Sequence, residues 1–426
     1  MPIKSHSRDA EASPGIALEK SHEWYGDGDT IVHGVYAEDV DPDSTIEIIT
    51  VGEVYRQANQ RTEAQMKIWN WNSNTQTLTL ESTNEWSLGG SKTAALSVHA
   101  ADIDDDNIVE IVTAGYGLLQ NETLHCDLIV WEYSPLSGWY AAVEIAQLIY
   151  TMYNSVYSAN IDTSDNYLEI AVAGVVFRNP DNATLDLFRW NGTHMSGLAH
   201  VEWQSGDTNA TAVYAKDVDG DTVVEILTGG YFYSNSDQWA EVRVWNYSNS
   251  NLNLEDSDDW QRLDGDTEVR SIFAENIDSD SDVEILACGR AIHGMTTELW
   301  GDLESFTHDG TDITKERNRQ WQAQQDDTVC SSVFVKEVTG SAPIDIITGG
   351  RALISGTQNG QVVVWNRDGA TFDSLDSVEW YTTDDTEVHS VYAEDVDADN
   401  PVEILSGGQA YDRTRIKAQL RIWYWT

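Results

Sequence analysis

The sequence predicts an all-β protein, a seven-bladed β-propeller with four antiparallel strands in each blade. Three observations carry this prediction: one sequence unit recurs seven times, each unit contains four strand-like segments, and the two chain ends complete each other. The chain of 426 residues is 41% hydrophobic and has seventeen tryptophans, so large apolar side chains are available for a packed core.

The repeated unit is clearest in the segment VYAEDVDPDSTIEIITVG, which begins at Val35. Related segments begin 57 to 63 residues apart and fill the chain, which leaves no room for a second domain. Repetition at such a period is typical of solenoids and propellers. The other six segments begin at Val98, Val156, Val213, Ile272, Val333 and Val391.

Each unit reads as four short strands. The first strand ends in an acidic loop, as in VHSVYAEDV, and the second is an apolar run such as VEIL. The third carries a tryptophan, as in VRVWNY, and the fourth resembles LTLESTNEW. Apolar residues alternate or cluster between turn residues, which favours strands over helices and, with four per unit, a propeller blade. The innermost strands are expected to start near residues 32, 95, 153, 210, 269, 330 and 388.

The chain ends predict how the ring closes. The last unit stops after its third strand, in RIWYWT, whereas IALEKSHEW at residues 16–24 matches the fourth strand LTLESTNEW. We therefore expect residues 16–24 to form the outer strand of the last blade. Residues 1–15 are expected to be a disordered tail, and residues 16–426 a single propeller.

The charge balance restricts the partners. The chain has 72 acidic and 24 basic residues, a net charge of −48. Such a chain repels phosphate groups, so we predict no nucleic-acid partner and no adsorption to anionic membranes. No segment approaches the roughly 20 apolar residues of a membrane span, so no direct membrane insertion is expected.

The loop between the first and second strands carries oxygen-bearing side chains at positions 1, 3, 5 and 9. Four loops have four carboxylates each: Asp39, Asp41, Asp43, Glu47; Asp102, Asp104, Asp106, Glu110; Asp217, Asp219, Asp221, Glu225; and Asp395, Asp397, Asp399, Glu403. Two loops are variants: Asn276, Asp278, Asp280, Glu284; and Asn160, Asp162, Asp165, Glu169, where one extra residue allows Ser164 to take the middle role instead. The sixth loop, with Glu337, Thr339, Ser341 and Asp345, is too poor in charge to hold an ion.

These loops predict sites for a hard cation. Alternate residues of a tight loop turn inward together, and converging carboxylates repel one another unless a cation joins them. Ca²⁺ takes six to eight oxygens in a flexible cage, whereas Mg²⁺ requires stricter geometry. The absence of His and Cys from the loops argues against transition metals. The alternative is that the aspartates only form turns, but the repeated spacing favours Ca²⁺ at five or six sites in each chain.

The segment DVDGDTVVEI and its equivalents resemble the calcium loops of FG-GAP/VCBS-type repeats, the family that includes the integrin α-subunit propeller. The resemblance covers all seven units. It implies that calcium rigidifies the face on which these loops lie. The sequence departs from the family where Tyr-Ala and Gly-Gly replace the Phe-Gly and Gly-Ala-Pro signatures, and where position 9 is Glu instead of Asp.

The connections between the second and third strands vary most and lie on the opposite rim. They hold Arg56, Arg178, Arg290, Arg351 and Arg413 beside several tyrosines. Because arginine and aromatic residues are common anchors of interfaces and sugar sites, we expect a protein or glycan partner here. The alternative is that these arginines only pair with the surplus acids.

No catalytic motif is recognisable: there is no HExxH, no GxSxG and no Rossmann glycine pattern. We therefore predict a non-catalytic, calcium-stabilised binding or scaffold protein. The alternative is a lyase or hydrolase that acts on polysaccharides. An extracellular or cell-surface location is expected, with the leader absent from this chain, while a cytoplasmic location stays open, as do the identity of the ligand and the oligomeric state.

Overall fold

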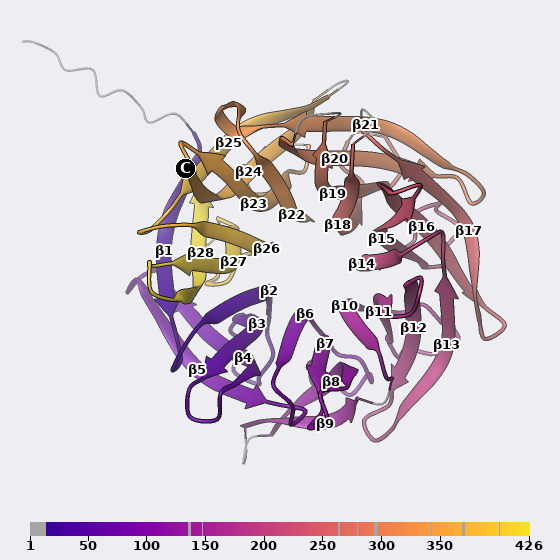
Figure 1. Ribbon diagram of the computed structural model, residues 1–426, viewed down its shortest axis with the longest axis horizontal. Coiled ribbons are helices and arrows are strands. Elements are labelled where there is room, and N and C mark those ends of the chain that lie inside the picture. The colour runs from indigo at the N-terminus through magenta and orange to yellow at the C-terminus, as the bar shows by residue number, and fades with distance from the viewer. Residues whose placement is uncertain are drawn as a thin grey trace, which may run out of the picture.

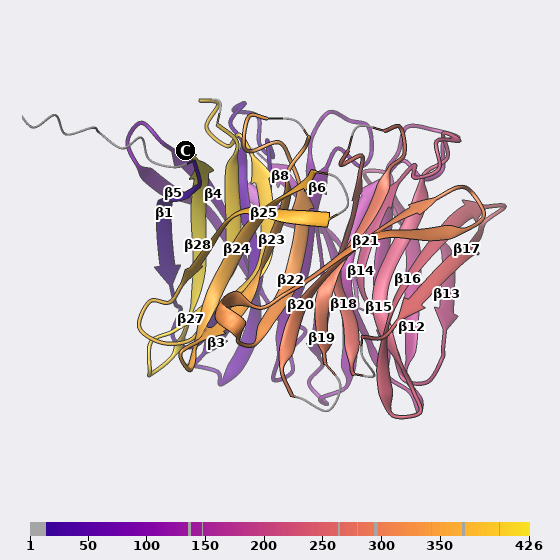
Figure 2. The same cartoon turned by 90° about the horizontal axis from the view of Figure 1, so that it is seen from above.

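The chain forms seven four-stranded antiparallel sheets around one axis, which confirms the predicted fold (Figure 1). The structure is a computed structural model that describes residues 14–134, 138–146, 148–262, 265–278, 280–293, 297–341, 343–368, 371–399 and 401–426. Most of the tail expected at residues 1–15 lies outside these ranges. In the side view, the strands run between the two faces of a disc (Figure 2).

In every blade the strands follow one another from the axis outward. The innermost strands are β2 (Thr30–Glu38), β6 (Thr93–Ala101), β10 (Thr151–Ala159), β14 (Thr208–Lys216), β18 (Thr267–Glu275), β22 (Thr328–Val335) and β26 (Thr386–Glu394). The second strands are β3 (Glu47–Arg56), β7 (Glu110–Leu118), β11 (Glu169–Val176), β15 (Glu225–Ser234), β19 (Glu284–Ile292), β23 (Ile346–Ile354) and β27 (Glu403–Tyr411).

The two outer positions complete each sheet. The third strands are β4 (Arg61–Asn72), β8 (Leu124–Ser134), β12 (Asn182–Trp190), β16 (Asp237–Ser248), β20 (Leu299–His308), β24 (Thr357–Asp368) and β28 (Ile416–Trp425). The outer strands are β5 (Thr77–Trp86), β9 (Gly138–Ile145), β13 (Met195–Trp203), β17 (Asn251–Trp260), β21 (Ile313–Trp321), β25 (Thr371–Trp380) and β1 (Ile16–Trp24). The described residues form one short helix, η1 (Ala323–Gln325), and none of their helices is long and apolar enough to cross a membrane.

The N-terminal strand closes the ring, as the sequence predicts. β1 pairs with β28 in antiparallel register, from Ile16 opposite Trp425 to Trp24 opposite Ala418. The same strand contacts both neighbouring blades, because the Ile16 N–H donates to Asp376 and the Lys20 ammonium donates to the Gln76 carbonyl. Blade 7 is therefore built from both ends of the chain.

Each innermost strand begins at a threonine, two residues before the start expected from its apolar pattern. These threonines are buried, and their hydroxyls bond to the backbone of the preceding loop. The Thr30 hydroxyl, for example, donates to the Gly28 carbonyl and accepts the Gly26 N–H. A polar residue therefore opens a buried strand because its hydroxyl satisfies loop backbone groups that would otherwise be unpaired.

One aromatic side chain from each blade lies around the axis, and together they form a closed ring that we call the aromatic collar. Neighbouring collar rings lie with their centroids 4.3 to 4.9 Å apart around the whole circle, in the tilted arrangements that aromatic pairs prefer. Burial lowers the pKa of the one histidine in the collar, His99, to about 3, so its ring is neutral. The collar consists of Tyr36, His99, Tyr157, Tyr214, Phe273, Phe334 and Tyr392.

A tryptophan at the end of the outer strand packs against the third strand of the next blade at six of the seven junctions. We call this contact the indole seal. The ring pairs are Trp24–Trp69, Trp86–Trp131, Trp203–Trp245, Trp260–Phe306, Trp321–Trp365 and Trp380–Trp423, with centroids 4.7 to 5.4 Å apart. Each outer-strand indole N–H also donates to a third-strand acceptor at 2.7 to 3.1 Å: Gln65, Asp127, Glu241, Asp302, Gln361 or Gln419.

Whether the third-strand ring is anchored within its own blade depends on whether it is a tryptophan or a phenylalanine. In five blades it is a tryptophan whose N–H donates to a hydroxyl on the second strand, as Trp69 does to Thr50 at 3.0 Å. In blades 3 and 5 the ring is Phe188 or Phe306, and the hydroxyl is replaced by Val172 or Ala287. The two positions therefore change together, because a buried hydroxyl without a partner is unfavourable.

Asp127 is an indole acceptor whose charge is not compensated. It is 2% exposed, its Oδ2 accepts the Trp86 N–H at 2.7 Å, and its buried Oδ1 accepts no hydrogen bond. The equivalent acids Glu241 and Asp302 lie 2.5 and 3.5 Å from arginines, whereas Asp127 has no ion pair with any described residue. Burial raises the pKa of Asp127 to about 7.

We predict that Asp127→Asn stabilises the protein above pH 7. The folded-state pKa lies above the unfolded value of about 3.9, so the wild type loses stability as the pH rises from about 4 to 7. At about 1.4 kcal/mol per pKa unit, the variant should be more stable by about 2–4 kcal/mol at pH 8. Its amide can still accept the Trp86 N–H. Urea unfolding of both proteins between pH 4 and 8 is the measurement, and parallel pH profiles would contradict the prediction.

Candidate functional site

The acidic loops all lie on one face of the ring, because each joins an innermost strand to the second strand of the same blade. Their position-9 acids form a common anchor. In every loop this carboxylate is buried and accepts the N–H of the apolar residue at loop position 2, as Glu225 accepts that of Val218 at 2.9 Å. Position 9 therefore shapes the loop whether or not an ion is present.

Burial also makes these anchors easier to protonate. It raises the pKa of Glu47 to about 7, and nearby loop aspartates add to the effect of burial that raises the pKa values of Glu110, Glu225 and Glu403 to about 8. The loop side chains therefore form clusters of mutually repelling carboxylates. A cation among them would relieve this repulsion.

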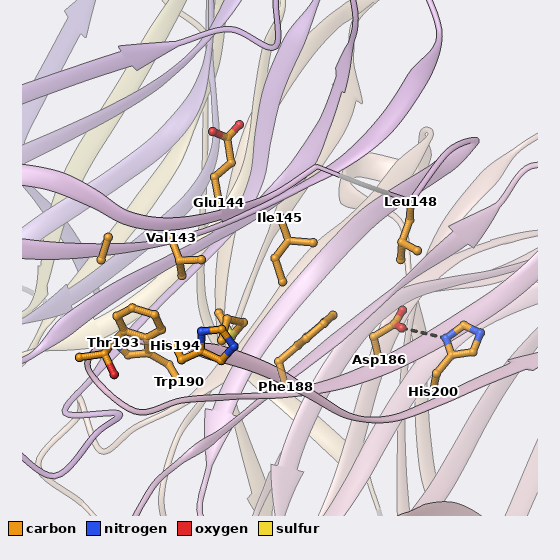
Figure 3. Close-up of a pocket in the computed structure, with 12 residues that line it drawn as sticks. Val143, Glu144, Ile145, Leu148, Asp186, Phe188, Trp190, Thr193, His194 and His200 are labelled. Carbon is orange, nitrogen blue, oxygen red and sulfur yellow. Dashed lines mark hydrogen bonds and ion pairs between the residues drawn. The ribbon is translucent and has the colours of Figure 1, made fainter.

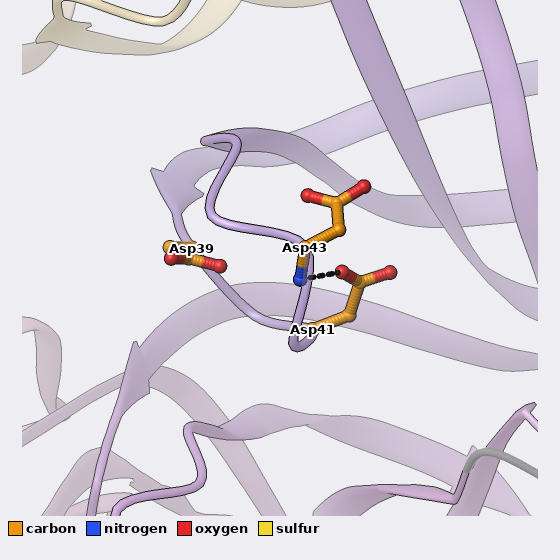
Figure 4. Close-up of side chains that lie close together, drawn as sticks. All are labelled: Asp39, Asp41 and Asp43. Carbon is orange, nitrogen blue, oxygen red and sulfur yellow. Dashed lines mark hydrogen bonds between the residues drawn. The ribbon is translucent and has the colours of Figure 1, made fainter.

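Four loops are open acidic clusters, those of blades 1, 2, 4 and 7. Carboxylate oxygens lie within 4.8 Å of one another in the sets Asp39, Asp41, Asp43; Asp102, Asp104, Glu110; and Asp217, Asp219, Glu225. Figure 4 shows the first set, in which the Asp43 N–H donates to Asp41. The Oδ1 atoms of Asp39, Asp104, Asp395 and Asp397 are buried and accept no hydrogen bond. Unpaired buried oxygens in an all-oxygen donor set fit a hard divalent cation.

Other acids of these four loops accept hydrogen bonds, either from backbone N–H groups of the same loop or from the next blade. The Asp106 and Asp221 carboxylates accept N–H groups two residues further on, those of Ile108 and Val223. Asp399 accepts the Ser73 hydroxyl at 3.0 Å, and Asp397 accepts the Ser73 N–H at 3.1 Å. The blade 7 loop thus touches the turn between β4 and β5 of blade 1.

Other loops meet the next blade in the same way. A Cβ added at Gly192 of blade 3 would lie 2.5 Å from Oδ2 of Asp104, and one at Gly310 of blade 5 would lie 2.8 Å from Oδ2 of Asp219. Both glycines also have positive φ, which L side chains rarely adopt. The glycines therefore leave room for the aspartate carboxylates at the blade junction. An ion in such a loop would lie beside this junction.

The blade 3 loop holds a guanidinium group. Arg189 of β12 lies directly opposite Glu169 in the β11–β12 register and contacts three acids. Its nitrogens lie 2.6 Å from Glu169, 3.0 Å from Asp162 and 3.0 Å from Asp165. Asn160 turns its amide N–H to the Asp165 carbonyl at 3.3 Å. The side chain of Arg189 thus occupies the place where an ion would bind.

The blade 5 loop holds an arginine from the next blade. Arg367 of β24 is buried and lies 2.8 Å from Asp278, 2.8 Å from Glu284 and 3.0 Å from Glu316. The oxygens of Asp278, Asp280 and Glu284 also lie within 4.8 Å of one another, which by itself would suggest an ion site. Glu284 Oε1 is buried and accepts no hydrogen bond, as in the open loops, but here the guanidinium forms ion pairs that compensate the charge. Asn276 donates to the Asp280 carbonyl.

The blade 6 loop is closed by hydroxyl groups. Thr339 Oγ1 lies 2.9 Å from the Ser341 hydroxyl and 3.2 Å from Oδ1 of Asp345, and Glu337 accepts the Ser341 N–H at 3.0 Å. Sequence reasoning did not find the arginines of the other two loops. The sequence contained a signal for Arg189: the residue opposite position 9 is a cation in blade 3, whereas in blade 1 it is the uncharged Asn70.

The arginines named on the opposite rim are largely paired with acids. Arg178 lies 2.7 Å from Glu202, Arg290 lies 2.9 Å from Glu268, and Arg351 lies 3.3 Å from Glu387. Arg56 pairs with Glu85, and Arg413 is exposed with a φ of 72°.

A polar cavity of about 490 Å³ opens on this rim, where blades 6 and 7 meet Asp29 in the connection between β1 and β2. Its lining includes the Arg351–Glu387 pair, Gln358, Gln409, Tyr411 and Arg415. Amides, one aromatic ring and paired charges can bind hydroxyl and carbonyl groups. The cavity thus offers the chemistry of a binding site, and its residues come from both ends of the chain.

Comparisons with known proteins add little to this geometry. No family model matches the sequence, and no curated protein matches it. Among solved structures, the chain is similar to one in the crystal structure of BBS1N in complex with ARL6DN, soaked with lead. The two share 9% sequence identity over 92% of this chain and 90% of that chain, with a TM-score of 0.47.

We predict that Arg367→Met destabilises the protein by about 3–5 kcal/mol, because it leaves buried carboxylates without their partner. Arg178→Met is the matched control. It breaks an ion pair in which the arginine is 55% exposed, and should cost no more than about 1 kcal/mol. Chemical denaturation measures both, and equal losses would contradict the assignment of Arg367 as an internal cation.

Proposed function

We propose that this chain is a non-catalytic, calcium-stabilised β-propeller, outside the cell or at its surface, that binds a protein or glycan through the rim opposite its acidic loops. The observation that carries the proposal is the set of four open acidic loops at blade junctions. The loop spacing supports membership of the FG-GAP/VCBS-type repeats as part of the same proposal.

Calcium is assigned to the loops of blades 1, 2, 4 and 7. Their donors are all oxygens, and three of the four loops contain buried carboxylate oxygens that accept no hydrogen bond. The loops of blades 3 and 5 already contain guanidinium groups, and that of blade 6 is joined by hydroxyls. The proposal is therefore four ions in each chain, fewer than the five or six expected from the sequence. When bound, Ca²⁺ would supply positive charge that holds the loop against the next blade.

The calcium assignment predicts that removing one arginine increases the number of bound calcium ions by one. Wild-type protein should bind four ions, and Arg189→Ala should bind five, because removing the guanidinium frees Asp162, Asp165 and Glu169. Equilibrium dialysis against calcium with elemental analysis measures both counts. Arg178→Ala on the other rim is the control and should keep four.

The calcium experiment tests two parts of the proposal separately: that calcium binds, and that arginine replaces it in some loops. No bound calcium would overturn calcium stabilisation as a whole. Five or six ions in the wild type, or an unchanged count in Arg189→Ala, would overturn the substitution of arginine for calcium and leave calcium binding intact.

The rim cavity is the proposed contact surface for the partner. Gln358 and Gln409 line it, and the Nε2 atoms of both lie within 3.5 Å of the Glu387 carboxylate. Such amides commonly bind sugar hydroxyls or peptide groups, and they leave the propeller core untouched when replaced.

We predict that Gln358→Ala combined with Gln409→Ala weakens partner binding at least tenfold without changing the melting temperature by more than a few degrees. A glycan array, followed by titration calorimetry of any glycan retained, is the measurement. Gln76→Ala, in a turn on the opposite face, is the control. Equal affinities of the double variant and the control would move the binding site away from this cavity.

A further inference from the structure

The junction between blades 2 and 3 lacks the indole seal that closes the other six. The outer strand β9 ends at Ile145, and residues 141–150 contain no tryptophan. By register the equivalent position is Gln147, which lies outside the described residues. The ring on the third strand of blade 3 is Phe188, which lies opposite Ile170 as Trp69 lies opposite Ile48. Phe188 therefore has no indole partner from the blade before it.

A cavity of about 570 Å³ lies at this junction, and we call it the junction pocket. Val143 and Ile145 of β9 extend toward Phe188 and Trp190 of β12, whereas Glu144 extends away from them (Figure 3). Leu148 and Met195 also line the pocket. The volume falls within the roughly 300–1,000 Å³ of small-molecule sites, and the walls are mainly apolar, as in such sites.

One carboxylate of the pocket, that of Asp186, lies where three other junctions place a cation. The position two residues after the indole acceptor holds Lys67, Arg243 or Arg421 in three blades, and each cation lies 4.7 to 5.7 Å from the centroid of a seal ring. Blade 3 has Asp186 two residues after Thr184, at the same place in the register. Blade 5 also has an acid at this place, Glu304, but Lys315 lies 2.6 Å from it and 5.1 Å from the centroid of the Trp260 ring. Asp186, in contrast, has no lysine or arginine partner among the described residues.

Asp186 has capacity for a further donor. It is 5% exposed, its Oδ1 pairs with Nδ1 of His200 at 2.8 Å, and its Oδ2 accepts the Thr184 hydroxyl at 3.1 Å. A carboxylate can accept about four hydrogen bonds, so two of these positions are used. The His200 side chain is 50% exposed at the edge of the pocket, so it can turn outward when a ligand ammonium takes its place beside the buried carboxylate.

We propose that the junction pocket binds a small planar aromatic ligand that carries an amine. The ring packs against Phe188, which has no indole partner from blade 2. The ammonium group takes the place of the missing lysine or arginine and pairs with Asp186, close enough to the aromatic walls for a cation–π contact. Both halves of the ligand thus replace groups that this protein supplies to itself elsewhere in the ring.

The first test uses three probes on the wild-type chain, by isothermal titration calorimetry at pH 7.5. Tryptamine has the ring and the ammonium, indole-3-acetate has the ring with an anion, and n-butylamine has the ammonium without a ring. Tryptamine should bind at least tenfold more tightly than either of the others. No heat of binding with tryptamine at 5 mM, or equal affinity for indole-3-acetate, would overturn the proposal.

The second test uses two variants. Asp186→Asn should weaken tryptamine at least tenfold and leave indole-3-acetate unchanged or tighter, because only the ion pair is lost. Leu148→Trp introduces a ring from the blade 2 side at a residue that is 38% exposed, so folding is tolerated while the pocket is filled. This variant should lose tryptamine binding and keep the wild-type melting temperature or exceed it. Unchanged tryptamine affinity in a folded variant would place the binding elsewhere.

Discussion

The contact between neighbouring blades is the interaction on which the rest of this structure depends. Each blade is a sheet with two largely apolar faces, and only the adjacent blades can cover them. The indole seal joins neighbouring blades near the outer edge of the ring at six junctions, and the aromatic collar joins all seven blades at the axis. Because blade 7 takes its outer strand from residues 16–24, its junction with blade 1 exists only when the two ends of the chain meet.

The same junctions determine the electrostatics of the acidic face. A chain with a net charge of −48 brings carboxylates together in six loops, and each cluster needs a compensating group. Two loops receive a guanidinium, from the same blade for Arg189 and from the next blade for Arg367. The other four have none among the described residues, and these uncompensated carboxylates, three sets of which include unpaired buried oxygens, are the reason for proposing calcium there. On the proposed assignment, a calcium ion and an arginine would be alternative ways to compensate the same charge repulsion.

Departures from the repeat are the most informative positions in a protein of this kind. Where all blades agree, as at the buried threonines or the position-9 acids, the residue supports the fold. Where one blade differs, as at the end of β9, where there is no tryptophan, the general packing is broken and a cavity remains.

The sequence by itself determined the number of blades, the four strands in each and the strand that closes the ring. These follow from short-range patterns, the alternation of apolar residues and the repeat of one unit, which need no knowledge of distant contacts. It also located the acidic loops, but not their state. Arg189 lies 20 to 27 residues from the acids it contacts, and Arg367 reaches across a junction. Only the tertiary structure decided which loops are open and that a cavity forms at the junction without an indole seal, because both depend on side chains brought together by packing between blades.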